Sequence, residues 1–151
     1  MSEPRSAARN RRAFHEYEIL EKLEAGIVLL GAEVKSLREG KASIAEAYAS
    51  FQGGELFLRE MHVPEYRNAG YAPQDPKRPR KLLLHRRELR RLEATLKKEG
   101  LTLIPLEVYF KRGMAKVELA LGRGRKLHDK RQALRKDEAR REIRRAMGRR
   151  G

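Results

Sequence analysis

The strongest constraint on the fold of this 151-residue chain is a run of alternating apolar and polar residues. In "LTLIPLEVYFKRGMAKVELAL" two extended runs flank a turn at Arg112 and Gly113. In the second run Val117, Leu119 and Leu121 alternate with polar or small residues. A period of two places successive side chains on opposite faces of a strand. The pattern therefore predicts an antiparallel β-hairpin with one face in the core.

Four further segments predict short strands and helices. The run "HEYEILEKLEAGIVLL" predicts two strands with a turn or bulge near Ala25 and Gly26. A second hairpin is predicted around Gly53 and Gly54, a dipeptide suited to a tight turn. The segments "GAEVKSLREGK" and "LLLHRRELRRLEATLKKEG" change to helical spacing, and each ends near a glycine suited to a helix C-terminus. In the second helix, His85 and Glu88 have the spacing of a capping box.

About six short strands and two helices, without βαβ alternation, favour a mainly β fold. A closed antiparallel barrel or a small sandwich satisfies this pattern, and we favour the barrel. We assign it to residues 14–121. Residues 1–13 have the composition of a flexible basic arm, and residues 122–151 form a basic C-terminal tail.

The charge is large and unevenly distributed. The chain carries a net charge of +15, and residues 122–151 contain 13 basic and four acidic side chains. Such a field favours a polyanion, because neutralised phosphates release condensed counterions. An anionic membrane is the rival partner, but the chain has no Trp and its tail offers no wide apolar face. A merely solubilising tail, helical only in part on its own, remains the simplest alternative.

The sequence offers no residues for a recognisable catalytic or metal site. There is no cysteine, and none of the four histidines has metal-ligand spacing. The segment "HEYEI" has isoleucine where a zinc-binding H-E-x-x-H motif needs its second histidine, and no Gly-x-Ser-x-Gly elbow occurs. No apolar run approaches the length of a membrane-spanning helix. We expect a soluble cytoplasmic protein without cofactors that is not an enzyme.

Two basic clusters precede the tail. "NRRAFHEY" mixes basic and aromatic side chains, and "KRPRK" places four cations within five positions of a Pro-rich loop. Arg and Lys contact phosphate, whereas aromatic and polar groups can read unstacked bases and 2′-hydroxyls. These clusters, together with a barrel, predict an RNA-binding module.

Three segments in this order resemble one known family. "NRRAFHEYEILEKLEAGIVLLGAEVKSLREGKASI", "PRKLLLHRRELRRL" and "GLTLIPLEVYFKRGMAKVELALGRGRKLHDKR" are similar to small protein B, SmpB, the family that binds tmRNA in bacterial trans-translation. The resemblance implies an oligonucleotide-binding (OB-fold-like) barrel that binds the tRNA-like domain of tmRNA and accompanies it into stalled ribosomes. It also implies functional links, through tmRNA, to elongation factor Tu and alanyl-tRNA synthetase.

The resemblance also implies roles for individual residues. Glu24, Leu83 and Lys116 match positions important for tmRNA binding, and Asn10 and His15 match an RNA-facing N-terminal segment. The tail is implied to occupy the decoding centre and the empty mRNA channel, lined by 16S ribosomal RNA. The tail residues assigned to that role are Arg123, Arg125, Lys126, His128, Asp129, Lys130, Arg131, Arg135 and Lys136.

Two other functions remain open at this point. A generic basic ribosomal protein with the same barrel would bind many structured RNAs with little preference. An RNA-modifying or RNA-cleaving enzyme would show turnover that depends on a single carboxylate or histidine.

Overall fold

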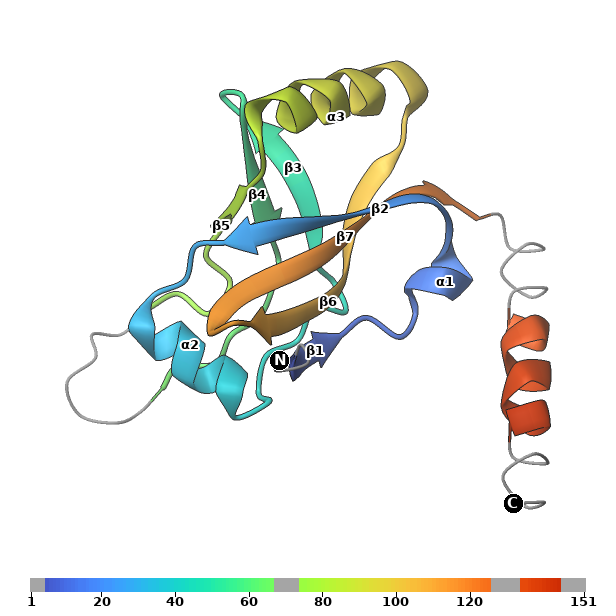
Figure 1. Cartoon of the computed structure of the whole chain (residues 1–151), viewed down its shortest axis with the longest axis horizontal. Coiled ribbons are helices and arrows are strands. Elements are labelled where there is room, and N and C mark those ends of the chain that lie inside the picture. Colours follow the sequence, from blue (N-terminus) through green and yellow to red (C-terminus); the bar gives the residue numbers. More distant parts are fainter. Residues whose placement is uncertain (1–4, 67–73, 126–133, 145–151) are drawn as a thin grey trace.

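The computed structural model describes residues 5–66, 74–125 and 134–144 (Figure 1). A further helix spans 134–144. The other elements, in chain order, are β1 (Arg5–Arg9), α1 (Ala13–Glu16), β2 (Tyr17–Ile27), α2 (Gly31–Arg38), β3 (Tyr48–Gln52), β4 (Glu55–Arg59), β5 (Arg80–Leu83), α3 (Arg86–Glu99), β6 (Thr102–Lys111) and β7 (Met114–Gly124).

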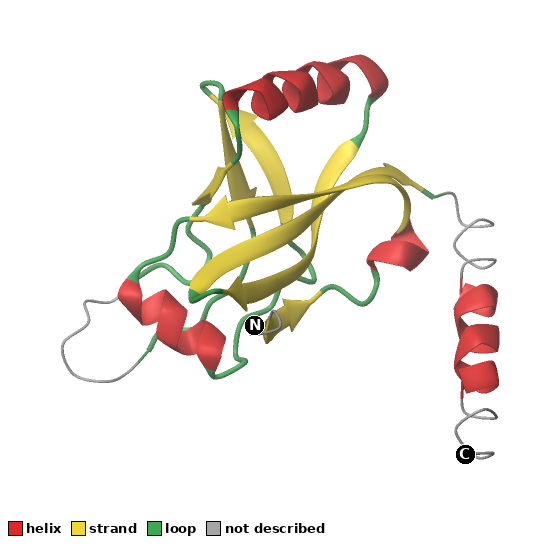
Figure 2. Ribbon diagram, viewed as in Figure 1, coloured by secondary structure: helices red, strands yellow, loops and turns green. Residues whose placement is uncertain are grey.

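The described strands form one antiparallel sheet that closes on itself (Figure 2). Its order is β1-β6-β3-β4-β5-β2-β7, and the additional pairing of β6 with β7 completes a barrel. One edge of β6 pairs with β3 near Leu103 and with β1 from Glu107 to Phe110. Closure leaves few strand edges unpaired, which protects a small β protein from edge-to-edge association. The predicted mainly β, barrel-like fold is confirmed.

The barrel interior is filled by the apolar faces of its strands. Val117, Leu119 and Leu121 of β7 are buried, as the alternation predicts, and Leu56 and Leu58 of β4 pack in the same cluster. A second, smaller cluster lies on the outer face of β6 and β7. There Ala13 of α1 packs with Ile104, Leu106 and Ala120. Helix α1 therefore covers part of the outside of the sheet.

Both predicted hairpins are confirmed. The turn between β6 and β7 places Arg112 at φ 54° and Gly113 at φ 76°, and the turn between β3 and β4 uses Gly53 and Gly54. Both predicted helices are also present, as α2 and α3. His85 is the N-cap of α3, but its side chain makes no capping hydrogen bond, so the predicted capping box is wrong.

Three predictions about strands need correction. The segment predicted as two strands is the single strand β2, because β7 pairs with it from Tyr17 to Gly26. Residues Arg80–Leu83, predicted as the end of a loop and the first residues of a helix, form β5 between β4 and β2. Residues Arg5–Arg9, placed in a flexible arm, form β1, which backbone pairing holds on β6.

Candidate nucleic-acid interface

Three residues that are far apart in sequence meet on one outer face of the barrel. Gly26 of β2 lies opposite Leu83 of β5 on one side and Lys116 of β7 on the other. Lys116 in turn lies opposite Tyr109 of β6. Glu24 is two residues before Gly26 on β2, so it points to the same side of the sheet. The structure thus brings together Glu24, Leu83 and Lys116, which the sequence could only name separately.

Leu83 gives this face an apolar element. Its side chain is 50% exposed although it borders the barrel. Its Cβ lies 3.3 Å from where a side chain on Gly26 would begin, so glycine lets Leu83 lie across β2. An exposed aliphatic side chain beside a cation suits contact with a ribose or a base plane together with a phosphate.

Glu24 is the most constrained polar group on the face. The hydroxyl of Tyr109 donates a hydrogen bond to its Oε2, and Nζ of Lys111 lies 3.5 Å from the same oxygen. The hydrogen bond from Tyr109 holds the pKa of Glu24 below its usual value, against the opposing effect of burial, with help from Lys111 and Lys116. Burial and the hydrogen bond to Glu24 raise the pKa of Tyr109. Glu24 is therefore an ionised acceptor, and Tyr109 keeps its proton.

The sequence analysis missed Tyr109 and Lys111. Tyr109 lies in a run of apolar residues on β6, where an aromatic residue is typical of the core, and the residue is only 8% exposed. The strand register places Tyr109 opposite Lys116 on the outer face, and the hydrogen bond to Glu24 shows that its hydroxyl reaches that face.

Helix α1 lies beside the same outer face, next to Lys22 of β2. The Phe14 ring lies 5.3 Å from Nζ of Lys22 on β2, a cation–π contact. His15, predicted to face RNA, has its Nε2 3.2 Å from Oδ2 of Asp137 in helix 134–144. Asp137 also pairs with Arg141 at 3.1 Å, as the helical spacing predicts. In this structure His15 therefore contacts the tail helix.

Asn10 anchors the chain between β1 and α1. Its backbone N–H donates to the carbonyl oxygen of Leu106 at 2.8 Å, and its side-chain amide donates to the carbonyl oxygen of Pro105 at 3.2 Å. Both contacts are with β6. This residue positions the N-terminal segment, and its RNA-facing role stays a prediction.

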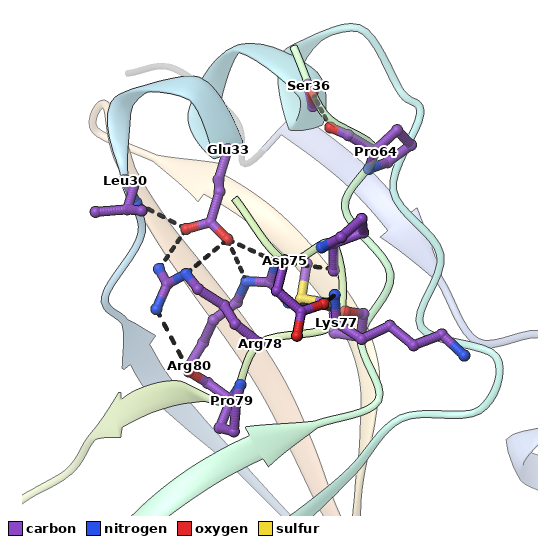
Figure 3. Close-up of polar contacts among 11 residues, drawn as sticks. Leu30, Glu33, Ser36, Pro64, Asp75, Lys77, Arg78, Pro79 and Arg80 are labelled. Carbon is purple, nitrogen blue, oxygen red and sulfur yellow. Dashed lines mark hydrogen bonds and ion pairs between the residues drawn. The ribbon is translucent and has the colours of Figure 1, made fainter. Parts of the chain in front are cut away.

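The cations of "KRPRK", which the sequence predicts to take part in RNA binding, have internal carboxylate partners, and Figure 3 shows those of Arg78 and Arg80. Arg78 and Arg80 both bind Glu33 of α2, and Arg80 is completely buried. The side chain of Lys81 lies 3.2 Å from Glu55, and that of Lys77 lies 3.6 Å from Glu60. A basic run in a sequence does not show which carboxylates pair with it. Here the main partner, Glu33, lies far earlier in the chain.

The carboxylate of Glu33 is ionised in this cluster. Burial raises the pKa of Glu33, but the hydrogen bonds from Arg78 and from the Leu30 N–H, and the charge of Arg80, outweigh it, so the pKa lies below the usual value. Arg80 also donates to the carbonyl oxygens of Met61 and Pro76 at 2.7 and 3.0 Å. The cluster ties α2 to the end of β4 and the start of β5. Its role is structural.

The boundary between barrel and tail lies later than predicted. Arg123, assigned to the tail, lies within β7 opposite Glu18, and the N–H of Arg125 donates to the carbonyl oxygen of Glu16 at 2.9 Å. Arg135 and Lys136 are exposed on helix 134–144. Five predicted tail residues lie outside the described residues: Lys126, His128, Asp129, Lys130 and Arg131.

Two other site classes find no support in the described ranges. Within residues 5–66, 74–125 and 134–144, no three His, Asp or Glu side chains are grouped to hold a metal ion. No helix in those ranges is long and apolar enough to cross a membrane.

A small closed barrel with a carboxylate, lysines and an exposed leucine on one face, followed by a basic tail, belongs to the class of β-barrel RNA-binding proteins. The family model described as SmpB protein matches residues 7–149. The chain therefore belongs to the SmpB family.

Individual relatives agree with this assignment. The SsrA-binding protein of Mycobacterium leprae is 54% identical over 143 residues, which is 95% of this chain and 89% of the relative. The SsrA-binding protein of Saccharopolyspora erythraea is 54% identical over 94% of this chain and 90% of its own length. A chain from the solved structure "tmRNA-SmpB: a journey to the center of the bacterial ribosome" is 52% identical, with a TM-score of 0.67. That match covers 84% of this chain and 93% of the solved one.

Proposed function

We propose that this protein binds the tRNA-like domain of tmRNA through the outer face that carries Glu24, Leu83 and Lys116, and delivers it to stalled ribosomes. The observation that carries the proposal is the meeting of these three side chains on adjacent strands β5, β2 and β7. Relatives about half identical along nearly the whole chain are SsrA-binding proteins, which supports the same partner.

Each part of the face supplies a different contact. Lys116 forms no salt bridge within the described part of the chain, so its ammonium group is available to a phosphate. Leu83 packs against a sugar or base, and Glu24 accepts a hydrogen bond. A fixed carboxylate repels phosphate. The face therefore favours an RNA that places a hydrogen-bond donor, and not a phosphate, against Glu24. Such a face distinguishes one RNA from another better than a uniformly basic face does.

The tail serves the ribosome in this proposal. Residues 126–151 carry 11 basic and four acidic side chains. The part that is described as a helix, 134–144, has exposed cations along most of its length. We assign this tail to the decoding centre and the empty mRNA channel, where 16S ribosomal RNA surrounds it and helical order is stabilised by phosphate contacts. Elongation factor Tu and alanyl-tRNA synthetase act with the protein through tmRNA. The protein contributes binding, not catalysis.

The structure fixes where to cut the chain in a test of this division. Removing residues 126–151 keeps the pairing of β7 with β2 and the backbone contact of Arg125. The truncated protein is expected to bind the tRNA-like domain but to lose tagging of nascent chains on stalled ribosomes. Normal tagging by the truncated protein would contradict the role assigned to the tail.

The face itself is tested by Glu24→Ala and Lys116→Ala, with Lys97→Ala as the matched control. Lys97 is an exposed cation on α3, away from the face. Both face variants are expected to weaken binding to the tRNA-like domain, whereas the control leaves it unchanged. Equal, small losses in Lys116→Ala and Lys97→Ala would mean that charge alone is at work, as in a generic ribosomal protein.

A further inference from the structure

Tyr109 makes an unusual contact for a residue of the barrel wall. The residue is 8% exposed, yet its hydroxyl reaches the outer face and donates to Oε2 of Glu24. The two residues come from strands β6 and β2, and β7 runs between them. The contact therefore crosses a strand and fixes the carboxylate relative to the sheet.

The two oxygens of Glu24 are not equivalent. Tyr109 and Lys111 both bind Oε2, whereas no described side chain donates a hydrogen bond to Oε1. The side chain of Glu24 is 40% exposed, so the carboxylate is accessible to a partner. An exposed glutamate on its own loses rotamer freedom when it binds. A glutamate already held by two donors has less entropy to lose.

The charge state fixes what the open oxygen can recognise. The pKa of Glu24 is lowered by Tyr109 first of all, so the carboxylate is ionised at neutral pH and can only accept. The raised pKa of Tyr109 keeps its hydroxyl a donor. The partner of Oε1 must then be a hydrogen-bond donor, and RNA donors are ribose 2′-hydroxyls and base N–H groups.

We propose that Tyr109 is a positioning residue of the RNA-binding face, which holds Oε1 of Glu24 outward to accept a hydrogen bond from one donor of the RNA, a ribose 2′-hydroxyl or a base N–H group. The proposal rests on the proposed function, since it assumes that Glu24 meets RNA. It adds a residue, an atom and a chemical class of contact to that function.

The test on the protein side uses Tyr109→Phe, which removes only the hydroxyl and keeps the packed ring. Affinity for the tRNA-like domain is expected to fall about five- to tenfold, within the range for the net contribution of one ordinary hydrogen bond, because Lys111 still lies beside Oε2 of Glu24. The salt dependence of binding should not change, because no cation is lost. The matched control is Tyr48→Phe. Tyr48 is 40% exposed on β3, and its hydroxyl forms no hydrogen bond with the other described residues.

A double variant separates positioning from a general loss of structure. If Tyr109 acts through Glu24, then Tyr109→Phe in a Glu24→Ala background costs no further affinity. If the hydroxyl matters only for the fold, the losses of affinity in Tyr109→Phe and Glu24→Ala add. The melting temperature of Tyr109→Phe then falls together with its affinity. Additive losses would overturn the proposal.

The test on the RNA side identifies the donor. Single 2′-deoxy substitutions, or bases that lack one amino group, are placed along the tRNA-like domain. One substitution is expected to weaken binding by the native protein but not by Glu24→Ala, and its chemistry tells a 2′-hydroxyl from a base donor. If no substitution behaves in this way, Oε1 does not read a donor.

The binding face and the role of Tyr109 are distinguished by two single variants. If Glu24→Ala binds the tRNA-like domain as well as the native protein does, the proposed binding face is wrong, and the role of Tyr109 falls with it. If Glu24→Ala loses affinity and Tyr109→Phe does not, the face stands and only the positioning role is overturned.

Discussion

Replacing Glu33 with alanine is expected to damage the barrel severely, because it leaves a buried arginine without its anion. Arg80 is 0% exposed, and its Nε donates to Oε2 of Glu33 at 2.6 Å. Its other two hydrogen bonds go to the backbone carbonyls of Met61 and Pro76. These carbonyls satisfy donors but do not neutralise the charge. Arg78 loses the same partner.

The magnitude follows from the cost of an uncompensated buried charge. Removing one partner of a buried ion pair destabilises proteins by about 3–5 kcal/mol. A domain of this size has a total stability of about 5–15 kcal/mol, so the loss is a large fraction of it. The expected fall in the melting temperature is about 10–20 °C.

Urea unfolding and thermal unfolding measure this effect, with Glu21→Ala as the control. Glu21 forms a two-bond contact with Arg91 at 2.8 and 3.0 Å, but both side chains are well exposed. An exposed pair contributes at most about 1 kcal/mol, even in good geometry. Glu33 accepts four hydrogen bonds and Glu21 accepts two, so the contrast between the two glutamates measures burial together with the number of hydrogen bonds.

The pH dependence gives a second test of the same contact. The pKa of Glu33 in the folded state lies below 4.5, so the unfolded chain binds more protons in the interval between the two values. The stabilisation is present above that interval and is lost as the pH falls through the folded pKa. The difference in stability between the native protein and Glu33→Gln should therefore shrink in acid. A Glu33→Ala variant that loses less than about 1 kcal/mol would refute the reasoning.

Three further predictions concern the core, a turn and the face. Leu119→Ala in the fully buried core should cost about 2–5 kcal/mol in urea unfolding, and a smaller loss would mean that the barrel collapses around the cavity. Gly113→Ala, at φ 76° in the β6–β7 turn, should cost about 1 kcal/mol, and a neutral result would show that this turn relaxes. Lys116→Ala should lower the slope of log affinity against log salt by about one, and an unchanged slope would mean that Lys116 meets no phosphate.

The parts of the fold that the sequence predicted are those encoded locally. The alternation from Val117 to Leu121 and the glycines at the turns specify the hairpins without reference to the rest of the chain. Strand β1 was not predicted because its pairing with β6 is made by backbone groups, and the residues of "RSAAR" show no apolar alternation. Strand β5 was missed because a short apolar run next to a helix has no period of its own.

The same distinction holds for the candidate site. Resemblance named Glu24, Leu83 and Lys116, but only the register of β5, β2 and β7 puts them together. The sequence does not show the internal ion pairs of the basic cluster at 77–81, because its carboxylate partners, Glu33 foremost, lie in other elements. Tyr109 was missed because its hydrogen bond to Glu24 depends on the pairing of distant strands, which the sequence does not show.

The central claim is that the barrel selects the tRNA-like domain of tmRNA and does not simply attract RNA. The most direct measurement is the affinity of the full chain for that domain and for an elongator tRNA, determined across a series of salt concentrations. We expect a preference for the tRNA-like domain that persists as the salt rises, because the proposed contacts of Glu24 and Leu83 are not phosphate contacts. Equal affinities with equal salt slopes would contradict it.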